Sequence, residues 1–407
     1  MKIKFTILLM ACLLAGYLNG WGQTTRYVPE TAGNPGYSTI QAAISAASSG
    51  DVIQVSAGTY LQAQQLVIDK NLTLTGAGKA TTFIKADLNL TGGSATDPAL
   101  IKVNTGVTFN FSGFTVDGDF PAHQVRMGLI TYGTGGTISD NNFINVSLAA
   151  GSYDGRGVVV YGTGVTVSNN TLSNIGRIGI MVRKAYYGTQ VGSATVSGNT
   201  FMGKGEGLQL DYGIEVGAAA SATLSGNNIS NCKGVAYDNS TSAGILATDY
   251  YATGTTVTIS GNTLNDNRVG IALGYGVNDA TTASISGNTF TNHTINNLQY
   301  TANLNFDKNA TFTGNTFDHC AVIKNGSGAI TGSQFYVSIP DAVIDAAESD
   351  VIEMTSGTYN FTAQMNIDKA GLTITGQSGV IFKANNSSWS TVNGYKHLIG
   401  IYAGTET

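Results

Sequence analysis

A motif of the form Thr/Ser–apolar–Ser–Gly–Asn–x–apolar recurs seven times, with variations, between residues 137 and 317, and it constrains the fold more than any other feature of this chain. Successive copies are 26 to 35 residues apart. A fixed local motif at irregular spacing is typical of a solenoid, in which coils stack and loops absorb the differences in length. The copies align asparagines at Asn141, Asn170, Asn199, Asn227, Asn262, Asn288 and Asn315.

A second motif, a glycine followed by mainly apolar residues, precedes each of the first six copies. Segments such as Thr195–Val196–Ser197 alternate apolar and hydroxyl side chains, as a strand with one buried face does. Glycine and asparagine tolerate the left-handed backbone of a tight corner, and stacked asparagines can bond from coil to coil. The sequence therefore predicts an all-β parallel β-helix. The strand glycines are Gly128, Gly157, Gly179, Gly213, Gly244 and Gly270.

The composition agrees with many short strands joined by corners. Glycine accounts for 53 of 407 residues, and only 11% of the residues are charged. Such a chain is poor in the residues that favour helix interiors. The formal charge is −5 and there is no basic run, which argues against nucleic acid as a partner.

The first 22 residues have the pattern of a secretory signal peptide. Lys2 and Lys4 precede an apolar stretch over residues 5–18, and Gly20 and Gly22 supply small residues before a cut at Gln23. The stretch is too short to span a bilayer, and no other segment is a candidate span. The mature chain is therefore expected to be secreted or at the cell surface, with no transmembrane segment.

Residues 38–47 have the only helical pattern before the coils. Ser38 and Gln41 have the spacing of a capping box, and the apolar residues that follow form one face. A short helix is therefore expected to cap the first coil, which otherwise exposes its core and strand edges.

That segment returns near the end of the chain, since residues 342–384 match residues 42–86. We therefore expect a β-helix over residues 23–335 and the start of a second, truncated β-helix unit over residues 336–407. The chain is then the front part of a longer polypeptide. With an offset of 299 residues, the match pairs Asp51 with Asp350, Tyr60 with Tyr359 and Lys70 with Lys369.

The stretches GDVIQVSAGTY (50–60) and IDKNLTLTGAG (68–78), together with the Ser–Gly–Asn coils, carry a resemblance to a known family. The chain resembles the secreted bacterial right-handed parallel β-helix proteins of the pectin-lyase-like superfamily over about residues 25–335. The resemblance implies a right-handed solenoid. It implies no particular activity, because lyases, hydrolases, esterases and non-enzymatic surface proteins share these coils. The Asn–Thr–Asp motif of polygalacturonases and the Arg–x–Pro–x–x–Arg motif of pectate lyases are absent.

Tyrosines gather after the strand glycines, four to eight residues further along the chain. Neighbouring coils would place them side by side, where their rings can stack on sugars and their hydroxyls can bond to them. We therefore predict a polysaccharide-binding surface. The alternative is that these tyrosines pack their own loops. The candidates are Tyr161, Tyr186, Tyr187, Tyr250, Tyr251 and Tyr275, with Tyr132 at one end.

Charged residues flank the same strands and suggest catalysis. A polysaccharide lyase needs a base to remove a proton and a cation to stabilise the enolate, and Arg183 or Lys184 would serve. A glycosidase uses two carboxylates, and Asp211 with Glu215 would form such a pair. These acids, or the turn 117–119 with its two aspartates, would also suit Ca²⁺. The alternative is ordinary surface charge.

Beyond this Ca²⁺ alternative, neither a metal site nor a disulfide is predicted. The four histidines lack a metal-ligand spacing. Cys232 and Cys320 each follow an aligned asparagine by five residues, so they occupy one column three coils apart. At about 4.8 Å per coil they are too far apart to pair.

Three functions follow from these features. The first is an exported or cell-surface protein that binds polysaccharide along its tyrosine-rich side. The second is a polysaccharide lyase or glycosidase acting on acidic glycans. The third is a non-catalytic adhesin or stalk.

Overall fold

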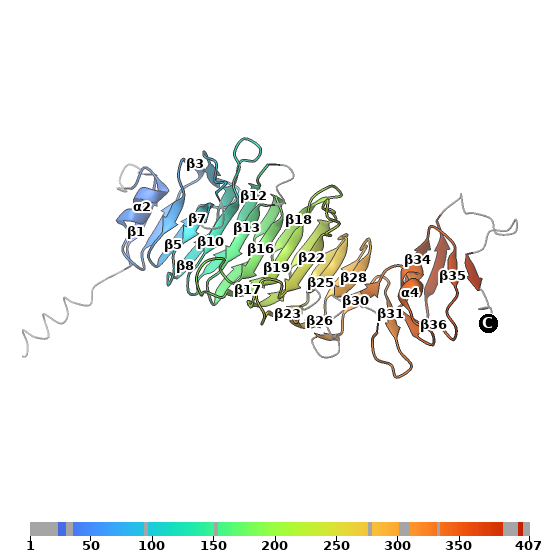
Figure 1. Ribbon diagram of the computed structural model, residues 1–407. Coiled ribbons are helices and arrows are strands. Elements are labelled where there is room, and N and C mark those ends of the chain that lie inside the picture. The colour runs from blue at the N-terminus through green and yellow to red at the C-terminus, as the bar shows by residue number, and fades with distance from the viewer. Residues whose placement is uncertain are drawn as a thin grey trace, which may run out of the picture.

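The structure is a computed structural model that describes residues 23–29, 36–92, 97–149, 154–275, 279–300, 310–331, 334–385 and 398–401. In this part of the chain, short strands stack coil upon coil into three long sheets around one core (Figure 1). The fold is a right-handed parallel β-helix, so the predicted fold class is confirmed. The predicted leader, residues 1–22, lies outside the described residues.

Each complete coil contributes one strand to each of three sheets. The first sheet is formed by β1 (Thr25–Val28), β2 (Val52–Val55), β5 (Leu72–Gly76), β8 (Phe109–Ser112), β11 (Thr137–Ser139), β14 (Val165–Ser168), β17 (Ser193–Ser197), β20 (Ser221–Ser225), β23 (Thr256–Ser260), β26 (Thr282–Ser286) and β29 (Ala310–Thr313). The second is formed by β3 (Gly58–Gln62), β6 (Thr82–Ala86), β9 (Thr115–Asp117), β12 (Asn142–Val146), β15 (Thr171–Ile175), β18 (Thr200–Gly205), β21 (Asn228–Cys232), β24 (Thr263–Asn265), β27 (Thr289–Thr291) and β30 (Thr316–Phe317).

The third sheet, called here the long sheet, carries the candidate site. Its parallel part is formed by β4 (Leu66–Ile68), β7 (Ala99–Val103), β10 (Met127–Thr131), β13 (Arg156–Val160), β16 (Ile178–Arg183), β19 (Tyr212–Gly217), β22 (Ala243–Thr248), β25 (Val269–Leu273) and β28 (Asn296–Tyr300). It then continues through β32 (Gln334–Tyr336), β31 (Ala321–Lys324), β33 (Val351–Met354) and β36 (Thr373–Gly376).

The aligned asparagines form a continuous ladder between the first and second sheets, as expected. The backbone N–H of Asn199 donates to Oδ1 of Asn227 at 3.0 Å, and that of Asn227 donates to Oδ1 of Asn262 at 2.9 Å. The Nδ2 group of Asn227 also donates to the carbonyl of Val196 at 2.9 Å. The same contacts repeat from Asn141 to Asn315, so the ladder provides hydrogen-bond partners for the buried backbone groups at the corner of each coil.

The strand glycines are required by close packing between sheets. A Cβ atom on Gly179 would lie 2.5 Å from a carbon of the Phe201 ring and 2.5 Å from the carbonyl oxygen of Gly213. The other strand glycines face the same kind of contact. This column thus lets the long sheet approach the second sheet.

A short helix, α2 (Ile40–Ala46), covers the first coil as predicted (Figure 1). The predicted capping box does not form, however. Thr39 is the N-cap and accepts from the N–H of Ala42 at 3.1 Å. Gln41 instead accepts from the backbone N–H of Val67 at 3.0 Å, because it reaches the adjacent long-sheet strand.

A second helix, α4 (Ile339–Asp345), packs with a separate apolar cluster near the end of the described chain. Strands β31 and β32 before it join this cluster, as do β34 (Gly357–Phe361) and β35 (Met365–Ile367). The two sheet pairs here are β34 with β37 (Val380–Ala384) and β35 with β38 (Ile399–Ile401). The boundary at residue 335 and the continuation past residue 407 stay predictions.

The two capping regions share a contact that the sequence match anticipates. The Tyr60 hydroxyl donates to the carbonyl of Ser56 at 3.0 Å, and the Tyr359 hydroxyl lies 3.1 Å from the carbonyl of Thr355. Cys320, whose carbonyl also bonds to Tyr359, is a free, buried thiol, as is Cys232. The prediction of two unpaired cysteines is confirmed.

Candidate functional site

The outer face of the long sheet is covered over β13, β16, β19 and β22, where every residue is buried. The register places Arg156, Ile178 and Tyr212 in one outward column. Met181 and Glu215 are paired in the next column. Loops that follow the strands fold back over these columns and form a second apolar cluster outside the main core.

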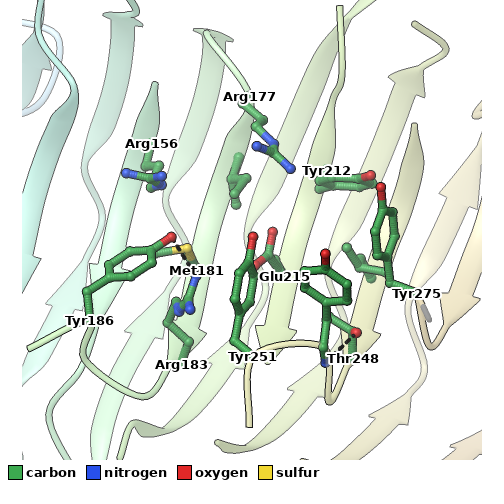
Figure 2. A pocket seen from close by; sticks show the side chains of 13 residues that line it. Arg156, Arg177, Met181, Arg183, Tyr186, Tyr212, Glu215, Thr248, Tyr251 and Tyr275 are labelled. Carbon is green, nitrogen blue, oxygen red and sulfur yellow. Dashed lines mark hydrogen bonds between the residues drawn. The ribbon is translucent and has the colours of Figure 1, made fainter. Parts of the chain in front are cut away.

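A hollow opens in this covered face, and we call it the arginine hollow (Figure 2). It combines three guanidinium groups with one carboxylate and five phenol rings. Its lining consists of Arg156, Arg177, Ile178, Met181, Arg183, Tyr186, Tyr212, Glu215, Leu246, Thr248, Tyr250, Tyr251 and Tyr275. Figure 2 shows Glu215 between the Arg177 end and the Arg183 end of the hollow.

Arg183 is held between two tyrosine rings. Its guanidinium carbon lies 4.0 Å from the ring centre of Tyr186 and 4.4 Å from that of Tyr251. One of its NH groups donates to the Tyr186 hydroxyl at 2.7 Å. The side chain is buried, and among the described residues no acid forms an ion pair with it. Cation–π contacts offset part of the cost of burying this charge, but they supply no counter-charge.

The other two arginines differ in their surroundings. Arg156 forms an ion pair with Asp154 at 3.1 Å, and Arg126 contacts the same carboxylate. The guanidinium of Arg177 lies 5.8 Å from the ring centre of Tyr212. All three guanidinium groups therefore line one hollow, each in different surroundings.

Among the described residues, Glu215 is the single carboxylate that lines the arginine hollow, and it is only 6% exposed. Burial raises the pKa of Tyr251, the Tyr186 phenol and the Glu215 carboxylate raise it further, and Arg183 opposes them. Burial likewise raises the pKa of Tyr212. Both phenols therefore stay protonated at neutral pH and act as hydrogen-bond donors rather than as bases.

Six tyrosines form a continuous line of rings across the coils, called here the tyrosine row. The centroid distances are 5.2 Å for Tyr132–Tyr161, 6.3 Å for Tyr161–Tyr186, 6.5 Å for Tyr186–Tyr251, 4.8 Å for Tyr251–Tyr250 and 5.0 Å for Tyr250–Tyr275. All the predicted tyrosines except Tyr187 thus lie side by side. Tyr250 and Tyr251 are more than half exposed, so their rings are open to a ligand.

Tyr161 departs from the prediction because it is buried rather than on the surface. The hairpin 184–191, closed by a bridge between Lys184 and Val191, carries Ala185 into the same outer cluster and Tyr186 against the Tyr161 ring. Tyr161 therefore supports the row and is no ligand surface in this structure.

Buried polar side chains hold the loops of Tyr250 and Tyr275. The Asp279 carboxylate accepts from the Thr248 hydroxyl at 2.6 Å and from the N–H of Tyr275 at 3.1 Å. Thr248 in turn accepts from the N–H of Tyr250 at 3.0 Å. One carboxylate thus ties the tyrosine loops of two successive coils.

A second hollow lies on the other side of the hairpin 184–191. It is lined by Asp97, Lys102, Asn104, Thr105, Tyr132, Tyr187 and Gln190. Tyr186 and Tyr187, adjacent in sequence, therefore line two different hollows.

The predicted carboxylate pair of Asp211 and Glu215 does not form in the arginine hollow. Asp211 is completely buried, forms an ion pair with Lys204 and also accepts from the Lys204 backbone N–H at 3.0 Å. Burial raises the pKa of Asp211, against the pull of Lys204. Lys184 is not among the lining residues either, because it closes the hairpin.

The turn 117–119 is not a free cation site, since the Asp119 carboxylate already has two side-chain partners. Its carboxylate lies 2.8 Å from Nζ of Lys85 and 3.0 Å from Nδ1 of His123. Within the described ranges, no group of three or more His, Cys, Asp or Glu side chains could hold a metal ion. Over the same ranges, no helix is long and apolar enough to cross a membrane.

The sequence interpretation missed Arg156 and Tyr212 as lining residues. Each directly precedes a strand glycine, and so does Ile178 in the coil between them. This alignment could have shown that they share one outward column.

Comparisons with known proteins agree with the fold. Residues 127–317 match the family model described as the right handed beta helix region. An alginate lyase from Paenibacillus sp. has a TM-score of 0.51 and 15% identity, over 68% of this chain and 91% of that one.

Two other solved structures have lower scores. The pectin methylesterase from carrot gives 0.45 at 14% identity, over 74% of this chain and 89% of that one. The family 28 exopolygalacturonase of Yersinia enterocolitica gives 0.43 at 10% identity, over 90% of this chain and 78% of that one. A search of curated proteins finds no match. The family match and the alginate lyase, at 15% identity, support the right-handed parallel β-helix and show the fold alone.

Proposed function

We propose that this chain is an exported or cell-surface protein that binds acidic polysaccharide in the arginine hollow. The observation that carries the proposal is the buried Arg183 guanidinium, stacked between two tyrosine rings with no ion pair to an acid among the described residues. A buried cation is costly without a counter-charge, so an anionic ligand gains from pairing with it. Planar guanidinium groups suit the carboxylates of uronic acids.

The tyrosine rings favour a sugar as the carrier of that anion. Tyr250 and Tyr251 offer exposed ring surface beside Arg183. Rings with polar edges suit sugars, which are apolar on their faces and polar at their rims. The predicted signal peptide at residues 1–22 supports export.

The test is the affinity of the full chain for polygalacturonate oligosaccharides, measured by titration calorimetry. Arg183→Ala removes a charge-assisted contact worth roughly 1.5–3 kcal/mol, so affinity should fall about 10- to 150-fold. Lys233→Ala is the control, because Lys233 pairs with Asp266 outside the hollow and its loss changes the net charge equally. Equal affinities of the two variants would overturn the proposal. The double variant with Tyr186→Ala and Tyr250→Ala should also bind the oligosaccharides more weakly than wild type. If the protein were only a stalk, this double variant and wild type would not differ in affinity.

Cleavage of the same glycan is the second candidate, because the buried Glu215 carboxylate lines the arginine hollow. Asp211 is held by Lys204, so the two-carboxylate glycosidase has only one of its acids in place. An elimination with Glu215 as base and Arg183 as cation would give an unsaturated uronate that absorbs in the ultraviolet. A rise in absorbance with pectin, alginate, chondroitin or hyaluronan that disappears in Glu215→Gln would establish cleavage, and a flat trace would leave binding.

A further inference from the structure

We propose that the second hollow binds an uncharged sugar of the same glycan, so that the natural ligand is a chain of acidic and neutral sugars. This inference rests on the proposed function of the arginine hollow. It concerns which sugars the glycan must contain.

The two hollows are placed to hold one chain. They lie on either side of the hairpin 184–191, with Tyr186 lining one and Tyr187 and Gln190 lining the other. Lys102 in β7 and Arg183 in β16 are separated by three strand spacings of the long sheet, about 14 Å. An extended glycan of a few sugars covers that length.

Charge distinguishes the two hollows. In the second hollow, the Asp97 carboxylate accepts from the Tyr132 hydroxyl at 2.8 Å and pairs with Lys102 at 2.9 Å. Among the described residues, the only acid and the only cation that line the second hollow therefore neutralise each other. A uronate placed there would lose hydration without gaining a cation, which is unfavourable.

The remaining groups suit a neutral sugar. Tyr187 is 64% exposed and presents its ring, while Asn104, Thr105 and Gln190 present amide and hydroxyl groups. The Gln190 amide donates to the Thr105 hydroxyl at 3.0 Å and so links the hairpin to a loop 85 residues earlier. This contact fixes the second hollow at a definite place beside the first. An aromatic face with uncharged donors and acceptors matches sugar hydroxyls.

The experiment compares two oligosaccharide probes of equal length on the full chain by titration calorimetry. One is polygalacturonate, in which every sugar is acidic. The other is deacylated gellan, which has a single glucuronate among neutral sugars in each repeat. Wild type should bind the gellan probe more tightly than polygalacturonate. When the glucuronate of gellan occupies the arginine hollow, a neutral sugar of the same chain can occupy the second hollow. Tyr187→Ala should cost about fivefold with the gellan probe, the equivalent of a single ring contact.

The same substitution should leave polygalacturonate affinity unchanged, because Tyr187 does not line the arginine hollow. Gln190→Ala is the second variant and should weaken binding of the gellan probe alone. Thermal midpoints equal to wild type would show that both variants are folded. Equal losses with both probes, or no loss with either, would overturn the inference while leaving the Arg183→Ala result intact. If Arg183→Ala leaves both affinities unchanged, the proposed function itself fails.

Discussion

Replacing Asn227 by alanine would test the asparagine ladder at its centre. Asn227 Oδ1 accepts from both the N–H and the Nδ2 group of Asn199, each at 3.0 Å. Its Nδ2 group donates to the Val196 carbonyl at 2.9 Å and to Asn262 Oδ1 at 2.8 Å. The substitution removes all four bonds and leaves the buried Asn199 N–H without its partner.

The expected cost follows from these contacts. One orphaned buried donor costs about 1–3 kcal/mol, and each other lost bond costs about 0.5–1.5 kcal/mol net. Two neighbouring contacts survive the substitution, which lowers the total cost of the lost bonds. Asn199 Nδ2 still donates to the Val167 carbonyl at 2.9 Å, and Asn262 Oδ1 still accepts from the backbone N–H of residue 227. We expect the free energy of unfolding to fall by roughly 3–4 kcal/mol.

Urea unfolding followed by circular dichroism measures this change, and hydrogen exchange localises it to the coils around Asn227. The control is Asn228→Ala, because Asn228 is the adjacent residue and is exposed. That substitution should change stability by less than about 0.5 kcal/mol. If the two variants are equally stable, the ladder does not hold the coils together and the reasoning is refuted.

Three further changes have defined outcomes. Burial lowers the pKa of His293 to about 4, so on acidification the unfolded chain binds a proton at this histidine before the folded chain does. The free energy of unfolding should therefore fall by roughly 3 kcal/mol as the pH drops from about 6.5 to 4. Urea titrations at several pH values should show that His293→Asn removes this part of the acid sensitivity. Gly179→Ala should lower the free energy of unfolding by about 1–3 kcal/mol, because its methyl group would meet the Phe201 ring, and an unchanged urea midpoint would contradict that packing. Asp279→Ala removes the hydrogen bond to the Thr248 hydroxyl and so releases the tyrosine loop. This variant should bind glycan more weakly and show broadened tyrosine resonances in NMR spectra. Sharp, unshifted resonances would show that the loop does not depend on this hydrogen bond.

The stacking of coils could be predicted from the sequence because its determinants recur once per coil. The column of asparagines and the column of strand glycines each reflect a local requirement that every coil must satisfy. Irregular spacing between copies did not obscure them, since the added residues lie in loops. The absence of a bond between Cys232 and Cys320 could be predicted in the same way, because their alignment with the asparagine column places them three coils apart.

The candidate site could be predicted only in part, because it depends on loops that fold back over the sheet. The tyrosines after the strand glycines gather as expected, but Tyr161 is covered by a hairpin from the next coil. Sequence spacing alone predicted that Asp211 pairs with Glu215, but in the structure Asp211 forms an ion pair with Lys204. Such pairings are set by loop conformation, which has no periodic signal.

The helix cap shows the same limit at short range. Ser38 and Gln41 have the right spacing for a capping box, but Thr39 is one residue closer to the first turn and makes the N-cap contact. Gln41 bonds to Val67 in the neighbouring strand, a partner that no local pattern indicates. Tertiary contacts therefore override a valid local motif.

The most direct test of the central claim is a crystal structure of the chain soaked with a polygalacturonate oligosaccharide. We predict a uronate carboxylate within hydrogen-bond distance of the Arg183 guanidinium, with a sugar ring against Tyr250 or Tyr251. An oligosaccharide bound on the first or second sheet, with the arginine hollow empty, would contradict the account.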